Sequence, residues 1–439
     1  MLIKLIVFLT SNLRYVIVIY IITVLVLVFS FDLTYSSDSL YYYKLAQQCI
    51  ELNEYYPAEQ HLYEDYIFAP LYINVIIILL KVSNSPLTIS VFNFLTILFQ
   101  LLVLYKIASK IFSSSVAQIS ILIYIFYLNT VGLVLQNYTE LFFVLMISLS
   151  IYLFLLNKNH FLVLSGIILG GAIAVRPTGW VLLLAFVSLH ICVSFKYRKL
   201  IWSYFFIYTG VFIFILCFGG LIYSHFGKFE YQSTTGPVNL LIGANDDATG
   251  GFKSTVFDEG KAGYIENPDT LTYIQKGDFY QGKALDWIKE QSVKWISLAP
   301  LKLLHAFGWD DIALSHLIGF HELNFGRALK NLFTGKSLSN RLGKDSWTTY
   351  VFYFSILFLN HIYYFIVLVT IALGIIHLVK NKSQNDGTKL ILFFLVISIV
   401  VLMIIFGSPR FKYPIFIMLC PFAAYYLKLK IIEGKKILE

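Results

Sequence analysis

The sequence predicts an all-α polytopic membrane protein with about ten, and at most twelve, transmembrane helices. Hydrophobic residues make up 58% of its 439 residues and charged residues only 13%, and the mean hydropathy is +0.74. A soluble globular chain of this length does not have such a composition. Apolar runs approaching the ~20 residues that cross a bilayer recur along the chain. Aromatic residues, at 17%, suit the interfacial belts of membrane proteins.

Ten apolar segments are predicted to span the membrane. The first begins after Lys4 and Arg14; it is too long for a signal peptide and lacks a small-residue cleavage site, so we expect a retained helix. The ten predicted spans are residues 16–31, 87–105, 116–136, 141–156, 161–175, 179–195, 201–223, 351–379, 390–406 and 414–427.

A further apolar run, residues 67–80, determines the topology. If this run does not cross, every short basic loop falls on the cytoplasmic side, as the positive-inside rule requires. The run is also short for a crossing, so we interpret it as a juxtamembrane or re-entrant segment. The basic residues then on the cytoplasmic side are Lys4, Arg14, Lys106, Lys110, Lys158, Lys196, Arg198, Lys199, Lys380, Lys382, Lys428, Lys430, Lys435 and Lys436.

This topology predicts a single transmembrane domain, residues 1–430, with a basic cytoplasmic tail at 431–439. Two loops face outward: a first outer loop at residues 32–86 and a large outer loop at 224–350. Apolar residues at helical spacing predict juxtamembrane surface helices in both, at 40–52 and 278–305. The net charge of +8 is explained by topology and does not indicate nucleic acid. The Cys and His spacing predicts no metal site.

Three charged residues stand out at the outer side of the membrane. Asp38 follows the first span, where an aspartate either caps the next helix or acts in catalysis. Arg176 and Arg410 lie at outer helix ends, against the positive-inside pattern. They either pair with a loop carboxylate, or extend to a lipid phosphate, or form a phosphate site, since arginine presents a planar fork of donors. A substrate with a lipid tail and a surface phosphate would suit this layout.

Six motifs occur in order between about residues 32 and 425: Asp38-Ser39-x-x-Tyr42-x-x-Leu45-Ala46, Ala69-Pro70-Leu71-Tyr72, Tyr138-Thr139-Glu140-Leu141-Phe142, Ala174-Val175-Arg176-Pro177-Thr178-Gly179, Gly243-Ala244-Asn245 with the 284–302 helix, and Arg410-Phe411-Lys412-Tyr413-Pro414. Together they resemble the GT-C membrane glycosyltransferases. The branch they resemble is glycosyltransferase family 39, with the protein O-mannosyltransferases and lipid A aminoarabinose transferases. The chain departs from that pattern at Ser39, where many members have a second acidic residue, and at Ala69, where proline is common.

The resemblance implies transfer of a sugar from a polyprenyl-phosphate donor to an outer-face acceptor, with inversion at the anomeric carbon. It assigns Asp38 as the catalytic base. It places Glu140, Arg176, Lys302 and Arg410 around the donor phosphate or sugar, with Tyr42 and Tyr413 from the matching motifs. Glu140 is equally compatible with an interfacial cap, and a lysine on an amphipathic surface helix, such as Lys302, is usually solvated.

The predicted partners are the lipid-linked donor, membrane lipid and an acceptor that is a glycolipid, a polysaccharide or a protein; the sequence identifies neither sugar nor acceptor. No cofactor is required by this chemistry, and a divalent cation is compatible with it. Short cytoplasmic loops favour a bacterial cytoplasmic (inner) membrane, with the active site outside. The alternatives are a lipid-linked-glycan flippase or other transporter, a polysaccharide polymerase or ligase, and a receptor or structural protein. The chain lacks the repeated halves and mid-span charges typical of transporters.

Overall fold

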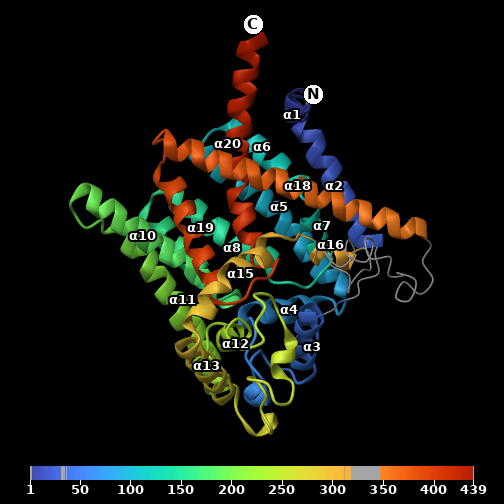
Figure 1. Ribbon diagram of the computed structural model, residues 1–439, viewed down its shortest axis with the longest axis vertical. Helices are drawn as coiled ribbons and strands as arrows, with labels where there is room; N and C mark the ends of the chain where they lie inside the picture. The colour runs from blue at the N-terminus through green and yellow to red at the C-terminus, as the bar shows by residue number, and fades with distance from the viewer. Residues whose placement is uncertain (1, 31–34, 36, 311, 318–346, 439) are drawn as a thin grey trace.

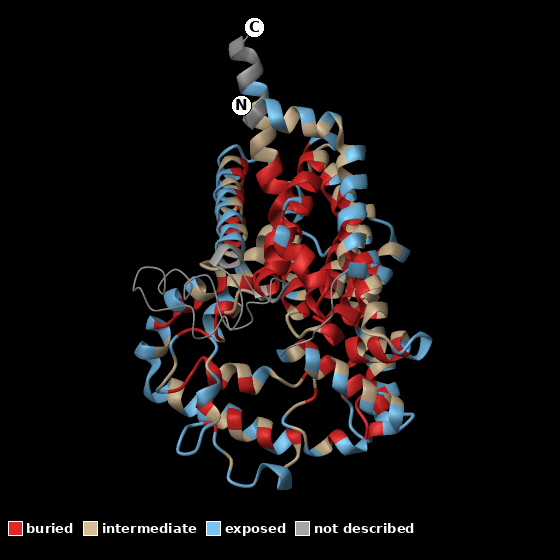
Figure 2. Ribbon diagram, turned by 90° about the vertical axis from the view of Figure 1, so that its right-hand side faces the viewer, coloured by how far each residue is buried: buried red, intermediate tan, exposed pale blue. Residues whose placement is uncertain are grey.

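The protein is a bundle of long helices with a lobe of shorter helices at one end (Figures 1 and 2). The computed structural model describes all residues except 1, 31–34, 36, 311, 318–346 and 439. Part of the predicted large outer loop, 318–346, therefore lies outside the described residues. The predicted all-α class is confirmed, and the described residues hold only an isolated β-bridge between Gly251 and Gly407.

The helices of the bundle coincide with the predicted spans. Seven described helices are long and apolar enough to cross a membrane, and a bent pair makes up to eight. Two shorter apolar helices of 17 residues, α8 and α9, cover the remaining predicted spans. The bundle consists of α1 (Leu2–Ser11), α2 (Leu13–Ser30), α5 (Pro86–Ile111), α6 (Ser114–Ile125), α7 (Leu128–Val134), α8 (Glu140–Leu156), α9 (Asn159–Val175), α10 (Gly179–Tyr197), α11 (Ser203–Phe226), α18 (Trp347–Lys380), α19 (Asp386–Ile404) and α20 (Tyr413–Leu438).

The predicted span 116–136 is not one continuous helix. The chain bends by 62° between α6 and α7. Tyr127 at the break has an extended backbone, and its hydroxyl donates a 2.6 Å hydrogen bond to Asp310 Oδ1. Neither a proline nor a glycine marks the break in the sequence. It is accounted for by this contact with a residue far along the chain, which local hydropathy cannot reveal.

The shorter helices form what we call the helical lobe. It contains α3 (Ser37–Glu51), η1 (Glu59–Tyr63), α4 (Pro70–Val82), α12 (Gly236–Ile242), η2 (Ser254–Phe257), η3 (Pro268–Thr270), α13 (Tyr273–Glu290) and α14 (Ser292–Ser297). Helices α15 (Ala299–Phe307) and α16 (Ile312–Leu317) connect the lobe to the bundle.

The arrangement of the lobe agrees with the predicted topology. Both chain termini lie at the end of the bundle opposite the lobe (Figure 1), as an even number of spans requires. Helix α4 has 13 residues, fewer than the ~20 that cross a bilayer, and it packs beside α3. The interpretation of residues 67–80 as a segment that does not cross stays a prediction.

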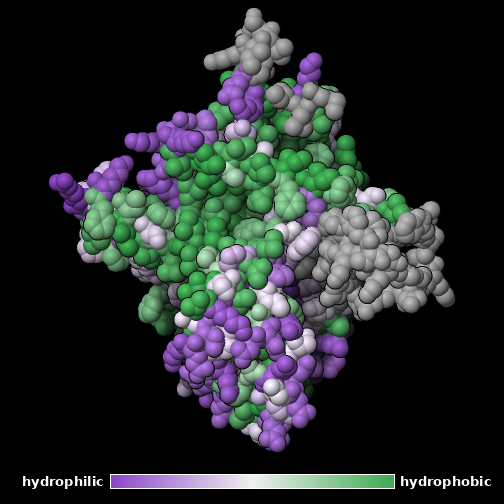
Figure 3. Space-filling view, viewed as in Figure 1, coloured by the Kyte–Doolittle hydropathy of each residue, from purple (hydrophilic) through white to green (hydrophobic). Residues whose placement is uncertain are grey.

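The surface of the bundle matches a lipid environment. Figure 3 shows a broad hydrophobic band over the bundle and hydrophilic surface over the lobe and near the two termini. Large apolar side chains on α11, such as Phe212 and Leu221, are more than 60% exposed. Apolar surface on this scale is stable only when lipid covers it, so the protein is an integral membrane protein.

Candidate active site

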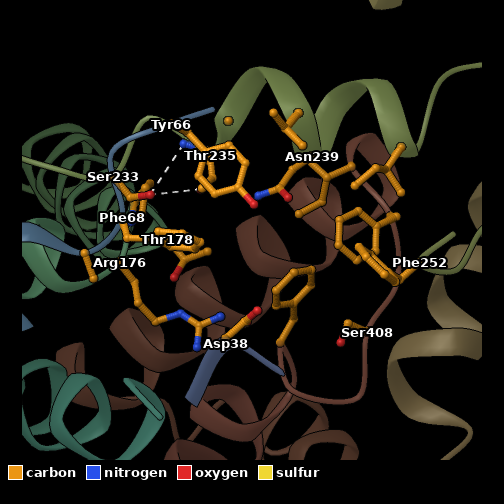
Figure 4. A pocket seen from close by; sticks show the side chains of 18 of the residues that line it. Asp38, Tyr66, Phe68, Arg176, Thr178, Ser233, Thr235, Asn239, Phe252 and Ser408 are labelled. Carbon is orange, nitrogen blue, oxygen red and sulfur yellow. Dashed lines mark hydrogen bonds between the residues drawn. The ribbon is translucent and has the colours of Figure 1, made fainter. Parts of the chain in front are cut away.

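A cavity of about 1160 Å³ lies where the bundle meets the helical lobe. Its wall is formed by residues of α3, α10, α12 and α19 and of the segments before α4 and α8 and after α19. Of the residues predicted to form the site, Asp38, Tyr42, Arg176 and Arg410 line this cavity. The structure therefore brings together side chains from three widely separated parts of the chain, and Figure 4 shows Asp38 and Arg176 close to each other at one end.

Four charged side chains form a continuous chain of ion pairs at this end. Arg410 NH1 lies 2.6 Å from Asp38 Oδ2, and Arg410 Nε lies 2.7 Å from Glu140 Oε1. Arg176 NH1 lies 2.7 Å from the same Glu140 oxygen. The Glu140 side chain is fully buried, whereas the arginines are 12% and 17% exposed and Asp38 is 41% exposed. The two positive and two negative charges balance, which makes burial of the group tolerable.

The predicted alternative that the two arginines pair with carboxylates is confirmed, yet both arginines also face the cavity. Each arginine has five N–H donors. Among the described residues, the carboxylate contacts use Nε and NH1 of Arg410 and NH1 of Arg176. Donors are therefore left on both guanidinium groups for an anion inside the cavity. The Arg410 guanidinium also stacks 4.1 Å from the centre of the Tyr138 ring, which restricts its orientation.

A contact between Ser39 and Asn137 holds Asp38 against the segment that carries Glu140. Asp38 lies in the first turn of α3, where a negative charge interacts favourably with the helix dipole. The next residue, Ser39, is fully buried and accepts a 2.7 Å hydrogen bond from the Asn137 backbone N–H. The Asn137 side-chain amide donates to the Ser39 carbonyl at 3.2 Å. At Ser39 this chain thus has a buried contact between α3 and the segment that precedes α8.

Lys302 lies behind the Arg410 segment and does not line the cavity. Its side chain is fully buried, so the expectation of a solvated lysine is wrong. Its Nζ donates to the carbonyls of Met403, at 3.2 Å, and Ile404, at 2.9 Å, at the end of α19. Burial lowers the pKa of Lys302 to about 8, although the two carbonyls favour the ammonium form. The Gly407 N–H donates to the Gly250 carbonyl at 2.8 Å and holds the same segment.

A second buried ion pair fixes the other end of that segment. Lys412 and Asp310 are both fully buried, with Nζ and Oδ1 3.0 Å apart, and Lys412 also donates to the Trp309 carbonyl. Tyr413 is buried beside them, does not line the cavity, and shares a 3.2 Å hydrogen bond with the Thr130 hydroxyl. Asp310 lies in the predicted large outer loop. No local signal links it to Lys412.

The cavity wall across from Asp38 was not predicted. It includes Tyr66, Ser233, Thr235, Asn239 and Phe252 (Figure 4). Four of these five residues lie in residues 229–261, which are rich in Gly, Asn, Asp and Thr. Such a composition indicates turns and does not specify a binding surface. Within the part of the chain that the structure describes, no group of three His, Cys, Asp or Glu side chains could hold a metal ion.

Comparison with known proteins supports the resemblance found in the sequence. Residues 68–223, less than half of the chain, match the family described as dolichyl-phosphate-mannose-protein mannosyltransferase. The structure resembles the Archaeoglobus fulgidus oligosaccharyltransferase in its apo form, with a TM-score of 0.51 and 13% identity over 97% of this chain and 51% of that one. The chain has the GT-C fold of membrane glycosyltransferases. It spans about half the length of the enzyme it resembles.

Other structures of that GT-C enzyme give the same fold match. The archaeal oligosaccharyltransferase AglB from the same organism, in complex with an inhibitory peptide and a dolichol-phosphate, matches with a TM-score of 0.51 and 14% identity over 97% of this chain and 51% of that one. The complex of the Archaeoglobus fulgidus oligosaccharyltransferase with Zn and sulfate matches with a TM-score of 0.50 and 13% identity, over 95% of this chain and 49% of that one. A search of curated proteins gives no match.

Proposed function

We propose that the protein transfers a sugar from a polyprenyl-phosphate-linked donor to an acceptor on the extracytoplasmic face of the membrane. The observation that carries the proposal is the single cavity in which Asp38 and two arginines meet at the edge of the bundle. The GT-C fold and the family match support the same class of reaction. The dolichol-phosphate in the AglB complex supports a lipid-linked donor. In a bacterium, this face is the outer face of the cytoplasmic membrane.

The donor phosphate would bind the free N–H groups of Arg176 and Arg410, since guanidinium groups bind phosphate oxygens through paired donors. An apolar flank adjoins this end of the cavity. It is formed by Val181 and Leu184 of α10 and by Val401 of α19, and it continues into a small crevice between α8, α10 and α19. A polyprenyl tail fits this flank, because it is apolar and lies on helices of the membrane-spanning bundle.

The chemistry is an in-line displacement. An acceptor oxygen forms a bond to the anomeric carbon while the bond from that carbon to the phosphate oxygen breaks, and its electron pair leaves with the polyprenyl phosphate. The proton of the acceptor hydroxyl passes to Asp38 as general base. The two arginines stabilise the charge that develops on the phosphate. Attack opposite the leaving group inverts the anomeric centre.

The buried members of the predicted site would act by positioning. Glu140 holds both arginines through one carboxylate oxygen. Lys302 fixes the end of α19, and Tyr413 is buried at the start of α20, on either side of Arg410. Asp38 is paired with Arg410 in this structure. A donor phosphate that takes over part of the Arg410 guanidinium would leave the Asp38 carboxylate available for the acceptor proton.

The test uses the full chain in nanodiscs with a panel of radiolabelled polyprenyl-phosphate sugars and membrane extract as acceptor. Asp38→Asn should lower transfer by about 10²- to 10⁴-fold. Asp286→Asn is the matched control, because Asp286 is 71% exposed and pairs with Lys289 on the lobe surface, so transfer should not change. Transfer is measured with and without a chelator, since a divalent cation is compatible with this chemistry.

Two outcomes would change the assignment. Full transfer by folded Asp38→Asn would reject Asp38 as the base and leave the glycosyltransferase in place. No turnover of any donor, together with translocation of a lipid-linked glycan in liposomes, would reject the enzyme and favour a flippase.

A further inference from the structure

The cavity wall across from Asp38 has a composition of its own. In Figure 4, Tyr66, Thr235 and Asn239 lie across the cavity from Asp38 and Arg176. The labelled residues of this wall combine aromatic rings with neutral hydroxyl and amide groups. The carboxylate of Asp65, next to Tyr66, also lines the cavity and pairs with Lys276 at 3.1 Å. Among the described residues that line the cavity, the arginines and lysines are Arg176 and Arg410, both at the Asp38 end. A second anion, such as an acceptor phosphate, has no cation to meet on the far wall.

Aromatic side chains face the cavity from two different loops. Phe252 is 64% exposed, yet its ring is held 5.6 Å from the ring of the buried Phe406. Tyr66 packs edge-on to Phe68 with ring centres 4.7 Å apart. Burial raises the pKa of the Tyr66 hydroxyl, so the group stays neutral and can donate a hydrogen bond. Aromatic rings that are held in place and exposed at a cavity can bind a flat apolar face of a ligand.

Apart from Asp65, the polar groups considered on this wall are short and neutral. Ser233 Oγ donates to the Ile67 carbonyl at 3.0 Å and shares a 3.0 Å hydrogen bond with the Thr235 hydroxyl, shown dashed in Figure 4. The Asn239 side chain, one turn further along α12, presents an amide with two donors and one acceptor. Groups of this kind hydrogen-bond neutral hydroxyls, which both donate and accept.

We propose that this wall binds the acceptor as a saccharide, so that the attacking nucleophile is a sugar hydroxyl. Sugar rings present apolar C–H faces that stack on aromatic rings and a rim of hydroxyls that pair with amides and hydroxyls. The cavity, at about 1160 Å³, exceeds the ~300–1,000 Å³ of ordinary small-molecule sites, which leaves room for a donor sugar and an acceptor sugar. The inference rests on the proposed function, because the acceptor must meet the donor beside Asp38.

The positions of the wall and of Asp38 determine how the acceptor sugar would be oriented. The acceptor sugar would lie between the aromatic wall and Asp38, with its hydroxyl directed toward the Asp38 end. Its oxygen forms the new glycosidic bond to the donor anomeric carbon, its proton goes to Asp38, and the phosphate of the polyprenyl carrier leaves with the electron pair of the broken bond.

The test compares acceptors and wall variants with the full chain in nanodiscs. The acceptors are cell-envelope oligosaccharides released from lipid, the same glycans on their lipid, and a peptide rich in serine and threonine. The variants are Phe252→Ala and Asn239→Ala. Tyr55→Ala is the control, because Tyr55 is a 53% exposed aromatic of the first loop that does not line the cavity. The readouts are the acceptor KM, the donor KM, donor hydrolysis without acceptor, and glycan binding by donor-free protein on an array.

We expect Phe252→Ala and Asn239→Ala to raise the glycan-acceptor KM about tenfold or more. Donor KM and donor hydrolysis should stay unchanged, and Tyr55→Ala should behave as wild type. If the wall variants raise the KM of free and lipid-linked glycans equally, the wall binds the sugar. If the KM of the lipid-linked glycan changes differently, the lipid also contributes to acceptor binding. Transfer to the peptide but to no glycan, or an unchanged glycan KM in both variants, would overturn the inference while the proposed function stood.

Glycan binding to the donor-free protein separates the two proposals. Binding that Phe252→Ala weakens supports the saccharide site even if the donor panel fails. An array without any bound glycan, combined with active donor hydrolysis, overturns the saccharide site alone.

Discussion

Replacement of Glu140 by glutamine tests the chain of ion pairs at the cavity. Oε1 of the fully buried Glu140 side chain accepts from both Arg176 NH1 and Arg410 Nε, each at 2.7 Å. Glutamine keeps the size of the side chain and an oxygen that can accept both bonds. It removes one of the two negative charges that balance the two arginines. The change therefore isolates the contribution of the Glu140 charge.

The expected loss follows from these contacts. A hydrogen bond to a charged group is roughly twice as strong as a neutral one. Weakening both bonds should therefore lower the free energy of unfolding by about 2 kcal/mol. Glu140→Ala leaves both guanidinium groups without this acceptor and should cost about 3–5 kcal/mol. A bound phosphate restores the missing negative charge. Polyprenyl phosphate should therefore stabilise Glu140→Gln more than it stabilises the wild type.

The assay is thermal unfolding in nanodiscs, followed by intrinsic fluorescence at several concentrations of polyprenyl phosphate. Glu230→Gln is the matched control. Glu230 accepts a 2.7 Å hydrogen bond from the neutral Tyr273 hydroxyl, and burial raises its pKa, so the neutral glutamine should cost little. If Glu140→Gln unfolded at the wild-type temperature and gained no extra stabilisation from the lipid phosphate, the idea that Glu140 balances a phosphate-binding arginine pair would be refuted.

Two further predictions concern the Arg410 segment and the bundle. Because burial lowers the pKa of Lys302 from 10.5 to about 8, its ammonium opposes folding below pH 8, and this cost disappears between about pH 8 and 10.5. The charged form strengthens both bonds to the end of α19, whereas the neutral amine donates more weakly, so donor affinity should fall as the pH rises through about 8. Lys302→Met should bind donor weakly without this fall, and an unchanged pH profile would contradict the positioning role. In the bundle, a Cβ on Gly166 of α9 would collide with the backbone of Ile207 in α11, whereas Gly220 has open space. Gly166→Ala should destabilise by about 1–3 kcal/mol and Gly220→Ala should not, which thermal unfolding of the pair measures.

The sequence by itself determined the membrane class, the positions of the helices and the location of Asp38, Arg176 and Arg410 at or near helix ends. These are local properties. Hydropathy over ~20 residues identifies a helix that must satisfy its own backbone in lipid, and the distribution of lysine and arginine orients it. Helix periodicity also predicted a helix at residues 40–52, which the structure has as α3 (Ser37–Glu51). The motif resemblance assigned Glu140 to the site. Its position in the sequence was equally compatible with an interfacial helix cap.

Only the tertiary structure decided what these residues contact. Arg410 meets Glu140 across 270 positions and Asp38 across 372, and Lys412 meets Asp310 in the same way. The break between α6 and α7, the burial of Lys302 and the aromatic wall with Phe252 also depend on distant segments. Ion pairs and cavity walls are formed by side chains that the fold brings together. A periodicity or a charge count along the chain contains no information about which of them will meet.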